Sequence, residues 1–229
     1  MIIAKAKNKT TLIQNKMKKF IISIAALAMA AISTFAQVNI GAGYSGTSMN
    51  PSEGDNTWYN GFNVSVGYNL PLGLGFQFCP SIEYNYLTNS ANVSAGIAGA
   101  SATSKNRFNE HYLNIPLMFN YGYEISPDAR IFVFAGPTGS FGLYADYTTK
   151  LEASLGGNSG SSDKQTVNIW GEDSNYKRCD VKIGGGVGID ICKHWRVQAG
   201  YDYGLVNRSK VDDLKLHHHS IKAGLTYMF

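Results

Sequence analysis

Residues 220–229 read SIKAGLTYMF, and their side chains alternate between two chemical classes. Ile221, Ala223, Leu225, Tyr227 and Phe229 share one face of an extended strand, because successive side chains of a β-strand point to opposite sides. The other face is mostly small or polar. A strand with these two faces and an aromatic end is typical of a barrel that meets lipid outside and is polar inside. Tyr227 and Phe229 are therefore predicted to form the assembly signal of such a barrel.

Eight segments of the chain share this two-residue period. They cover residues 38–45, 61–70, 72–84, 113–122, 131–144, 181–191, 195–203 and 220–229. Each apolar face is tall enough for the tilted strand of roughly 9–11 residues that crosses a bilayer. A soluble sandwich also alternates, but its outward face is charged, whereas these polar faces are rich in glycine and asparagine. The sequence predicts an all-β fold, an eight-stranded antiparallel up-and-down transmembrane β-barrel over residues 37–229.

Residues 1–36 have the pattern of a cleavable secretory signal peptide. A positive segment at Met17-Lys18-Lys19 precedes an apolar run over residues 20–32, and residues 34–36 (TFA) carry small side chains at the −3 and −1 positions. The run is shorter than the about 20 residues that a membrane helix needs. We expect Met17 to be the true start and residues 1–16 to be an upstream extension.

The positive charge of the chain belongs to this signal. The whole sequence has a formal net charge of +4, and removing the six lysines of residues 1–36 leaves 14 basic and 16 acidic side chains, a net charge of −2. The mature chain is therefore not expected to bind nucleic acid.

The connections between the expected strands alternate in length. Short turns are expected at Pro71, at residues 126–128 and at residues 193–194, and long loops at 47–57, 89–106, 148–178 and 207–215. Short periplasmic turns and long outer loops are the bacterial pattern, so both termini are expected in the periplasm. Loops 89–106 and 148–178 are rich in small polar residues and are predicted to be mobile. They would carry any contact with an extracellular or envelope protein partner.

The phase of the strands places ten charged side chains inside the barrel: Glu83, Glu124, Asp146, Asp180, Asp190, Asp202, Arg130, Lys182, Arg196 and Lys222. Symmetric short turns put Glu124 opposite Arg130 and Asp190 opposite Arg196, which are favourable cross-strand pairs. An eight-stranded interior is usually filled by side chains, and buried charges need partners. We predict a plugged, hydrogen-bonded interior. The alternative is a narrow path for small polar solutes or ions past Lys182, Asp202, Lys222 and Glu83.

The histidine run His217-His218-His219 is the strongest candidate for chemistry. Three adjacent strand residues cannot all point one way, and no cysteine or paired acid accompanies them, so no metal site is predicted. His218 and Ser220 have the spacing seen in lipid A deacylases and palmitoyltransferases. Both point inward, however, and no acid is placed to orient the histidine. We predict no catalytic residue, no cofactor and no enzyme activity.

The three cysteines, Cys79, Cys179 and Cys192, are an odd number and cannot form a fully paired disulfide framework. Cys79 and Cys192 are expected on the lumen phase of their strands, and Cys179 above the apolar band. We interpret them as small residues, with one disulfide left open in an oxidising periplasm.

Aromatic residues gather near both ends of the expected strands, as in the interfacial girdles of a transmembrane barrel. One set is Tyr68, Tyr121, Tyr123, Trp195, Tyr227 and Phe229, and the other is Tyr44, Trp58, Tyr59, Tyr84, Tyr86, Tyr147 and Tyr203.

Three passages resemble the PorT-like outer-membrane β-barrel family of Bacteroidetes. They are HYLNIPL at 111–117, FAGP at 134–137, and GGGVGID at 184–190 followed by GYDYGL at 200–205. The resemblance implies an eight-stranded barrel in the outer membrane and no shared activity. Outer-membrane lipid would surround such a barrel, and the barrel-assembly machinery would insert it. We expect a small structural or surface-interaction protein that acts through its outer loops.

Overall fold

The computed structural model of the chain describes residues 37–51, 56–97, 100–155, 158–170, 176–211 and 215–229. The signal peptide predicted over residues 1–36 lies outside this part. Among the described residues, none belongs to a helix long and apolar enough to cross a membrane. The strands are β1 Gln37–Pro51, β2 Thr57–Gly73, β3 Phe76–Ile97, β4 Ala100–Ser126, β5 Ala129–Leu155, β6 Asn158–Ser161, β7 Gln165–Asn168, β8 Cys179–Ile191, β9 Trp195–Gly204 and β10 Leu216–Met228.

Eight of these strands close into a ring, as the sequence predicted. The order is β1-β2-β3-β4-β5-β8-β9-β10, and β10 pairs with β1 along a ladder from Asn39↔Met228 to Pro51↔Leu216. Every neighbouring pair in the ring is antiparallel. The short strands β6 and β7 lie outside the ring and pair only with β5. Closure removes the free strand edges that an open sheet would expose.

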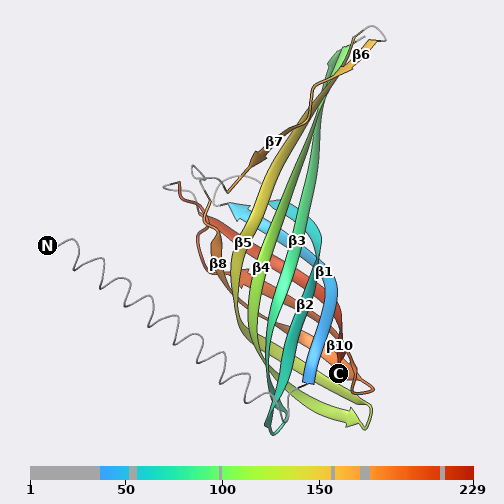
Figure 1. Cartoon of the computed structure of the whole chain (residues 1–229), viewed down its shortest axis with the longest axis vertical. Helices are drawn as coiled ribbons and strands as arrows, with labels where there is room; N and C mark the ends of the chain where they lie inside the picture. Colours follow the sequence, from blue (N-terminus) through green and yellow to red (C-terminus); the bar gives the residue numbers. More distant parts are fainter. Residues whose placement is uncertain (1–36, 52–55, 98–99, 156–157, 171–175, 212–214) are drawn as a thin grey trace, which may run out of the picture. The chain divides into compact units, whose positions relative to one another are not determined.

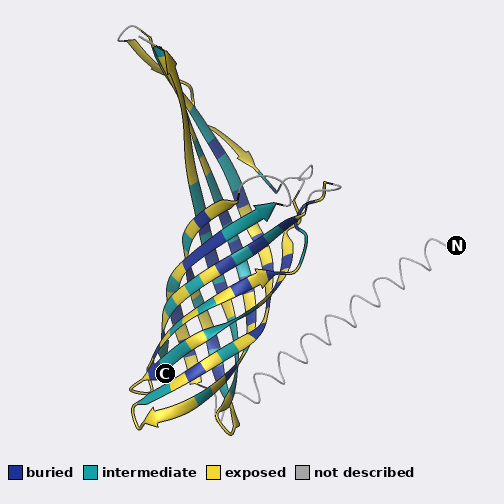
Figure 2. Ribbon diagram, turned by 180° about the vertical axis from the view of Figure 1, so that it is seen from behind, coloured by how far each residue is buried: buried dark blue, intermediate teal, exposed yellow. Residues whose placement is uncertain are grey.

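Burial alternates along each strand of the ring, which gives the banded appearance in Figure 2. On β2, Val64 and Val66 are exposed on the outer side, while Asn63 and Gly67 are buried on the inner side. The exposed apolar side chains form the surface that meets lipid, because a transmembrane barrel has apolar side chains on its outer face and polar side chains inside. The predicted phase of β2 is therefore confirmed.

The first short turn lies at Leu74 and Gly75 and not at Pro71, so the sequence-based placement was wrong. β2 continues through Pro71 to Gly73, and Gly73 pairs with Phe76. Leu74 has φ 52° and Gly75 has φ 84°, the positive angles of the two-residue turns that suit a twisted hairpin. Because Leu72, Leu74 and Phe76 continue the apolar alternation, the pattern concealed the turn. The predicted turns at residues 126–128 and 193–194 are confirmed.

We call the end of the barrel that carries these three turns, together with Gln37 and Phe229, the short-turn end. The opposite end differs from prediction. β3, β4 and β5 run far beyond the other strands as one antiparallel sheet (Figure 1). We call residues 90–97 of β3, 100–107 of β4 and 148–155 of β5 the protrusion. The prediction of loops at 89–106 and 148–178 was wrong for these residues, because small polar residues can form a regular ladder when each strand pairs with a neighbour.

A β-bulge on β5 changes which side chains point inward. His111 pairs with Tyr144 and Tyr112 pairs with Gly142, so Leu143 is the extra residue. An extra residue reverses the phase of the strand beyond it. Leu143 and Tyr144 are both exposed, and Ala145 is buried. The inward placement of Asp146 was therefore wrong: it lies on the outer phase, where it accepts a hydrogen bond from Asn109 at 3.0 Å.

Candidate functional site

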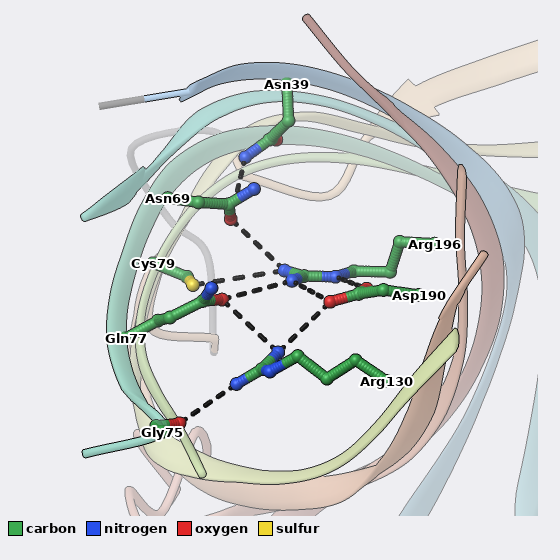
Figure 3. A network of polar contacts seen from close by, with 8 residues as sticks. All are labelled: Asn39, Asn69, Gly75, Gln77, Cys79, Arg130, Asp190 and Arg196. Atoms are coloured by element: carbon green, nitrogen blue, oxygen red, sulfur yellow. Dashed lines mark hydrogen bonds and ion pairs between the residues drawn. The ribbon is translucent and has the colours of Figure 1, made fainter. Parts of the chain in front are cut away.

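A network around Asp190 crosses the interior near the short-turn end (Figure 3). Arg196 Nε donates to Asp190 Oδ1 at 2.7 Å, and Arg196 Nη2 donates to Asp190 Oδ2 at 3.0 Å. Arg130 Nη1 donates to the same Oδ2 at 3.0 Å. A guanidinium that grips a carboxylate with two N–H groups makes one of the strongest side-chain pairs. The predicted placement of Asp190 opposite Arg196 is confirmed.

The same arginine reaches strands on the far side of the ring. Arg196 donates to Asn69 Oδ1 on β2 at 3.1 Å and to Gln77 Oε1 on β3 at 3.2 Å. Its guanidinium carbon lies 4.6 Å from the centre of the Phe132 ring on β5. One buried side chain therefore ties β9 to β2, β3, β5 and β8.

Glu124 lies directly opposite Arg130 in the ladder, as predicted, but the two do not form the expected ion pair. Glu124 is exposed, and the Arg130 side chain turns inward to Asp190 and to the carbonyl oxygen of Gly75. Its guanidinium lies over Gly122, where an added Cβ would be 2.4 Å from Arg130 Cζ. Arg130 thus pairs with the buried carboxylate of Asp190 and not with the solvent-exposed carboxylate of Glu124 across the strand pair. Glu124, Arg130 and Asp190 line a cavity of about 210 Å³ at this end.

A second ionic cluster lies midway along the interior. Lys222 Nζ contacts Glu83 Oε1 at 2.8 Å and Asp202 Oδ2 at 3.2 Å. Asn114 Nδ2 also donates to Glu83 Oε1, at 2.7 Å. The cluster joins β10 to β3, β4 and β9, and it borders a polar cavity of about 110 Å³.

Lys182 lies above this cluster and is buried. Its Nζ donates to Ser220 Oγ at 3.3 Å, and Ser220 lies 3.0 Å from Thr47 Oγ1. Asp180, two residues along β8, is buried on the same side of the strand. Nine of the ten charges predicted to point inward therefore lie on the inner phase, Asp146 being the exception, and Glu124 stands at the exposed rim.

A third polar cluster, which sequence reasoning missed, lies near the protrusion. Arg208 Nη1 donates to the Tyr112 hydroxyl at 2.6 Å and contacts the His218 ring, and Tyr112 donates to Glu110 Oε2 at 2.7 Å. Extending the phase of segment 113–122 backwards would have placed Tyr112 and Glu110 inside. Arg208 follows β9 in an irregular segment, where no period exists to reveal its direction.

An apolar cluster covers this polar group. Its buried members are Tyr59, Leu87, Tyr112, Ala145 and Trp170. Trp170, only 2% exposed, packs against the Tyr112 ring with centroids 5.4 Å apart. A cavity of about 330 Å³ lies beside the cluster and is lined largely by apolar side chains. The assignment of Tyr59 to an outward girdle was wrong, because its odd position on β2 points inward. Tyr147 also lines this cavity, since the bulge on β5 reverses its phase.

The histidines and cysteines do not assemble into a site in the described residues. His218 is buried inside, whereas His217 and His219 stack on Tyr203 and Tyr201 outside. Within the described part, no three histidine, cysteine or acidic side chains converge as metal ligands.

All three cysteines are free thiols, so the disulfide left open by the sequence does not form here. Cys192 lies in a turn with φ 51° and is exposed. Its expected place on the lumen phase of a strand was therefore wrong.

Comparison with known families identifies the class of protein. The family model described as "Outer membrane protein beta-barrel domain" matches residues 15–209. The chain belongs to this family, and it is a small β-barrel protein of the outer membrane. No curated protein matches the sequence.

Several solved structures are similar in fold. Ail, the attachment invasion locus protein of Yersinia pestis, is 14% identical, with 86% of this chain and 100% of that chain covered and a TM-score of 0.38. Neisserial surface protein A is 14% identical, with 85% and 99% covered and a TM-score of 0.45. The outer-membrane enzyme PagL is 10% identical, with 82% and 98% covered and a TM-score of 0.39.

Proposed function

We propose that this outer-membrane barrel is closed inside by its own side chains and acts at the cell surface through the protrusion, as a structural or surface-interaction protein and not as an enzyme. The short-turn end and both ends of the barrel chain would face the periplasm. The observation that carries the proposal is the protrusion, a sheet that extends beyond the barrel while the interior beneath it is crossed by polar contacts. On the sequence passages given above, we also place the chain in the PorT-like group.

The closed interior is supported by three layers of contacts. The Asp190 network lies at the short-turn end, the Lys222 cluster lies midway, and the Arg208 group lies under the apolar cluster near the protrusion. Each layer joins strands from opposite sides of the ring. Side chains that are held by several partners resist displacement, because breaking a buried pair leaves an uncompensated charge.

The interaction role is supported by the two unlike faces of the protrusion. One face carries Lys105, Lys150 and Glu152, and Glu152 forms ion pairs with Lys105 at 2.7 Å and with Lys150 at 3.1 Å. The hydrogen bond from Lys105, together with that from Lys150, holds the pKa of the Glu152 carboxyl below its usual value. The opposite face is uncharged and includes exposed Val93 and Leu151. Side chains sorted in this way suit contact with another molecule.

Single-channel conductance in a planar bilayer tests the closed interior. The purified barrel should show no steady openings, and the Asp190→Ala variant, which frees two arginines, should be the leakier of the two. Steady discrete openings of the unmodified protein, reduced by Lys222→Met, would instead establish a narrow pore. That second candidate function is favoured by the 110 Å³ polar cavity beside Lys222.

An epitope inserted between Ile97 and Ala100 tests the orientation. Antibody should label it on intact cells. Labelling only after the outer membrane is permeabilised would show that the protrusion faces the periplasm and would refute a surface role.

A further inference from the structure

The outer edge of β3 in the protrusion is a bare strand edge. β2 pairs with β3 only as far as Asn60↔Thr88, and the Asn89 side chain donates to the Trp58 carbonyl oxygen just beyond. From Ser90 to Ile97, β3 pairs with β4 on its other side, and no strand in the described chain pairs with its outer edge. Figure 1 shows these residues continuing past the end of β2. Unpaired backbone N–H and C=O groups in a row are a template for another strand.

The opposite edge of the same sheet is formed by β5, and other strands of the chain cover it. β6 pairs with β5 at residues 152–155, and β7 pairs with β5 at residues 146–149. Both covering strands are only four residues long, which limits further addition at that side. Within the described residues, the chain therefore covers one edge of the protrusion with its own segments and leaves the other edge open.

The open edge also lacks the residues that usually block strand addition. No charged residue and no proline occurs between Glu83 and Lys105. Natural proteins protect free edges with lysine, proline, bulges or short strands. The β3 edge has none of these over residues 90–97, so its backbone is chemically ready for pairing.

The side chains of this edge match a second copy of themselves. Ala91, Val93, Ala95 and Ile97 lie on one face, and Ser90, Asn92, Ser94 and Gly96 on the other. In an antiparallel pair centred on Val93, each apolar residue falls opposite an apolar or neutral one. Ala91 would face Ala95 of the second copy, and Asn92 would face Ser94. We propose that residues 90–96 of β3 pair antiparallel with the same residues of a second copy of this chain, with Val93 opposite Val93.

The geometry limits where this pairing occurs. Two barrels in one membrane send their protrusions in the same direction, so an antiparallel pair requires barrels in facing membranes. Because each protrusion has one bare edge, the contact closes as a twofold dimer and does not grow into a fibre. A ladder of seven residues from each copy is weak alone, but many copies on two surfaces add their contacts. The pairing between cells rests on the proposed surface orientation, whereas pairing of extracted molecules does not.

Charge substitution at the centre of the pair tests the proposal in detergent. Protein extracted from outer membranes should sediment as a dimer, with twice the protein mass of a monomer. Val93→Lys and Val93→Glu should each be monomeric, because like charges lie directly opposite each other. A mixture of the two variants should regain the dimer. Val93 is 64% exposed, so neither change should prevent folding, and the heat-dependent gel shift of a folded barrel would verify this.

Leu151 provides the matched control. It lies in the same row and on the same face as Val93, across Ser104 on β4, and is 50% exposed. Because it is two strands away from the bare edge, Leu151→Lys should remain dimeric. A monomeric unmodified protein, a Leu151→Lys variant as monomeric as Val93→Lys, or no recovery on mixing would each overturn the proposal.

Two cell populations that express the barrel and carry different fluorescent labels test the pairing between surfaces. Mixed clumps should form, should be lost with Val93→Lys in both populations, and should return when one population carries Val93→Glu. A dimer in detergent without clumps would place the error in the proposed orientation. Binding of cells to a foreign protein without self-pairing in either assay would refute the second copy as the partner.

Discussion

The Asp190→Asn substitution should destabilise the barrel far more than any other loss of a single acid near the short-turn end. Asp190 holds Arg196 through two hydrogen bonds and Arg130 through a third. The side chains of Arg196 and Arg130 are only 5% and 13% exposed, so in their present positions water cannot replace the carboxylate as their partner. Removing one partner of a buried pair reduces stability by about 3–5 kcal/mol. We expect Asp190→Asn to fall within this range.

Glu124→Gln is the matched control. Both residues are acids on the inner phase, and both face an arginine directly across a strand pair. Glu124 is exposed, however, and Arg130 does not form its ion pair with it. An exposed pair contributes at most about 1 kcal/mol, so Glu124→Gln should leave the free energy of unfolding nearly unchanged.

Urea unfolding of the barrel in lipid vesicles, followed by tryptophan fluorescence, measures both changes. The two variants should differ by at least about 2 kcal/mol, the gap between those ranges. Equal losses, or a larger loss for Glu124→Gln, would show that the register alone decides the pairing and that the inward turn of Arg130 is wrong.

Three further changes follow from local geometry, and the first two use the same unfolding measurement. Leu74→Asn should raise stability by about 1 kcal/mol, because Leu74 is 95% exposed with φ 52° and asparagine tolerates the left-handed region better than leucine; a loss would contradict this. Gly184→Ala should lower stability by about 1–3 kcal/mol, since its Cβ would lie 1.9 Å from Asp202 Oδ1, whereas Gly139→Ala meets no atom within 4 Å and should show no such loss. Trp170→Ala should lower stability by about 3–5 kcal/mol, measured by loss of the folded gel band, and an unchanged band would mean that the apolar cluster does not hold the barrel mouth.

Much of the fold could be predicted because a strand's period is a local property. Residues 220–229 contain their own alternation, and eight such segments with alternating short and long connections permit one simple ring. The register at residues 126–128 and 193–194 followed as well, because a short symmetric turn determines which residues face each other. The turn at Leu74 and Gly75 escaped because its residues continue the apolar period.

The alternation along each strand predicts whether a side chain points inward, and the candidate site could be predicted only to that extent. The sequence indicated that Arg130, Asp190 and Arg196 point inward, but not that both arginines share one carboxylate. The Arg208 group was missed, and Asp146 was misplaced beyond the bulge at Leu143.

The sequence by itself determined the number of strands in the ring, the two chemical faces of the barrel and most of the inward charges, since all of these depend on neighbours along the chain. Only the tertiary structure decided which charges meet, because ring curvature brings β9 against β2, β3 and β5, strands that no turn connects to it. It also decided that β3, β4 and β5 form a protrusion with one bare edge. Small polar residues such as those at 90–107 are compatible with loop or strand, and their state depends on whether a partner strand completes their backbone hydrogen bonds.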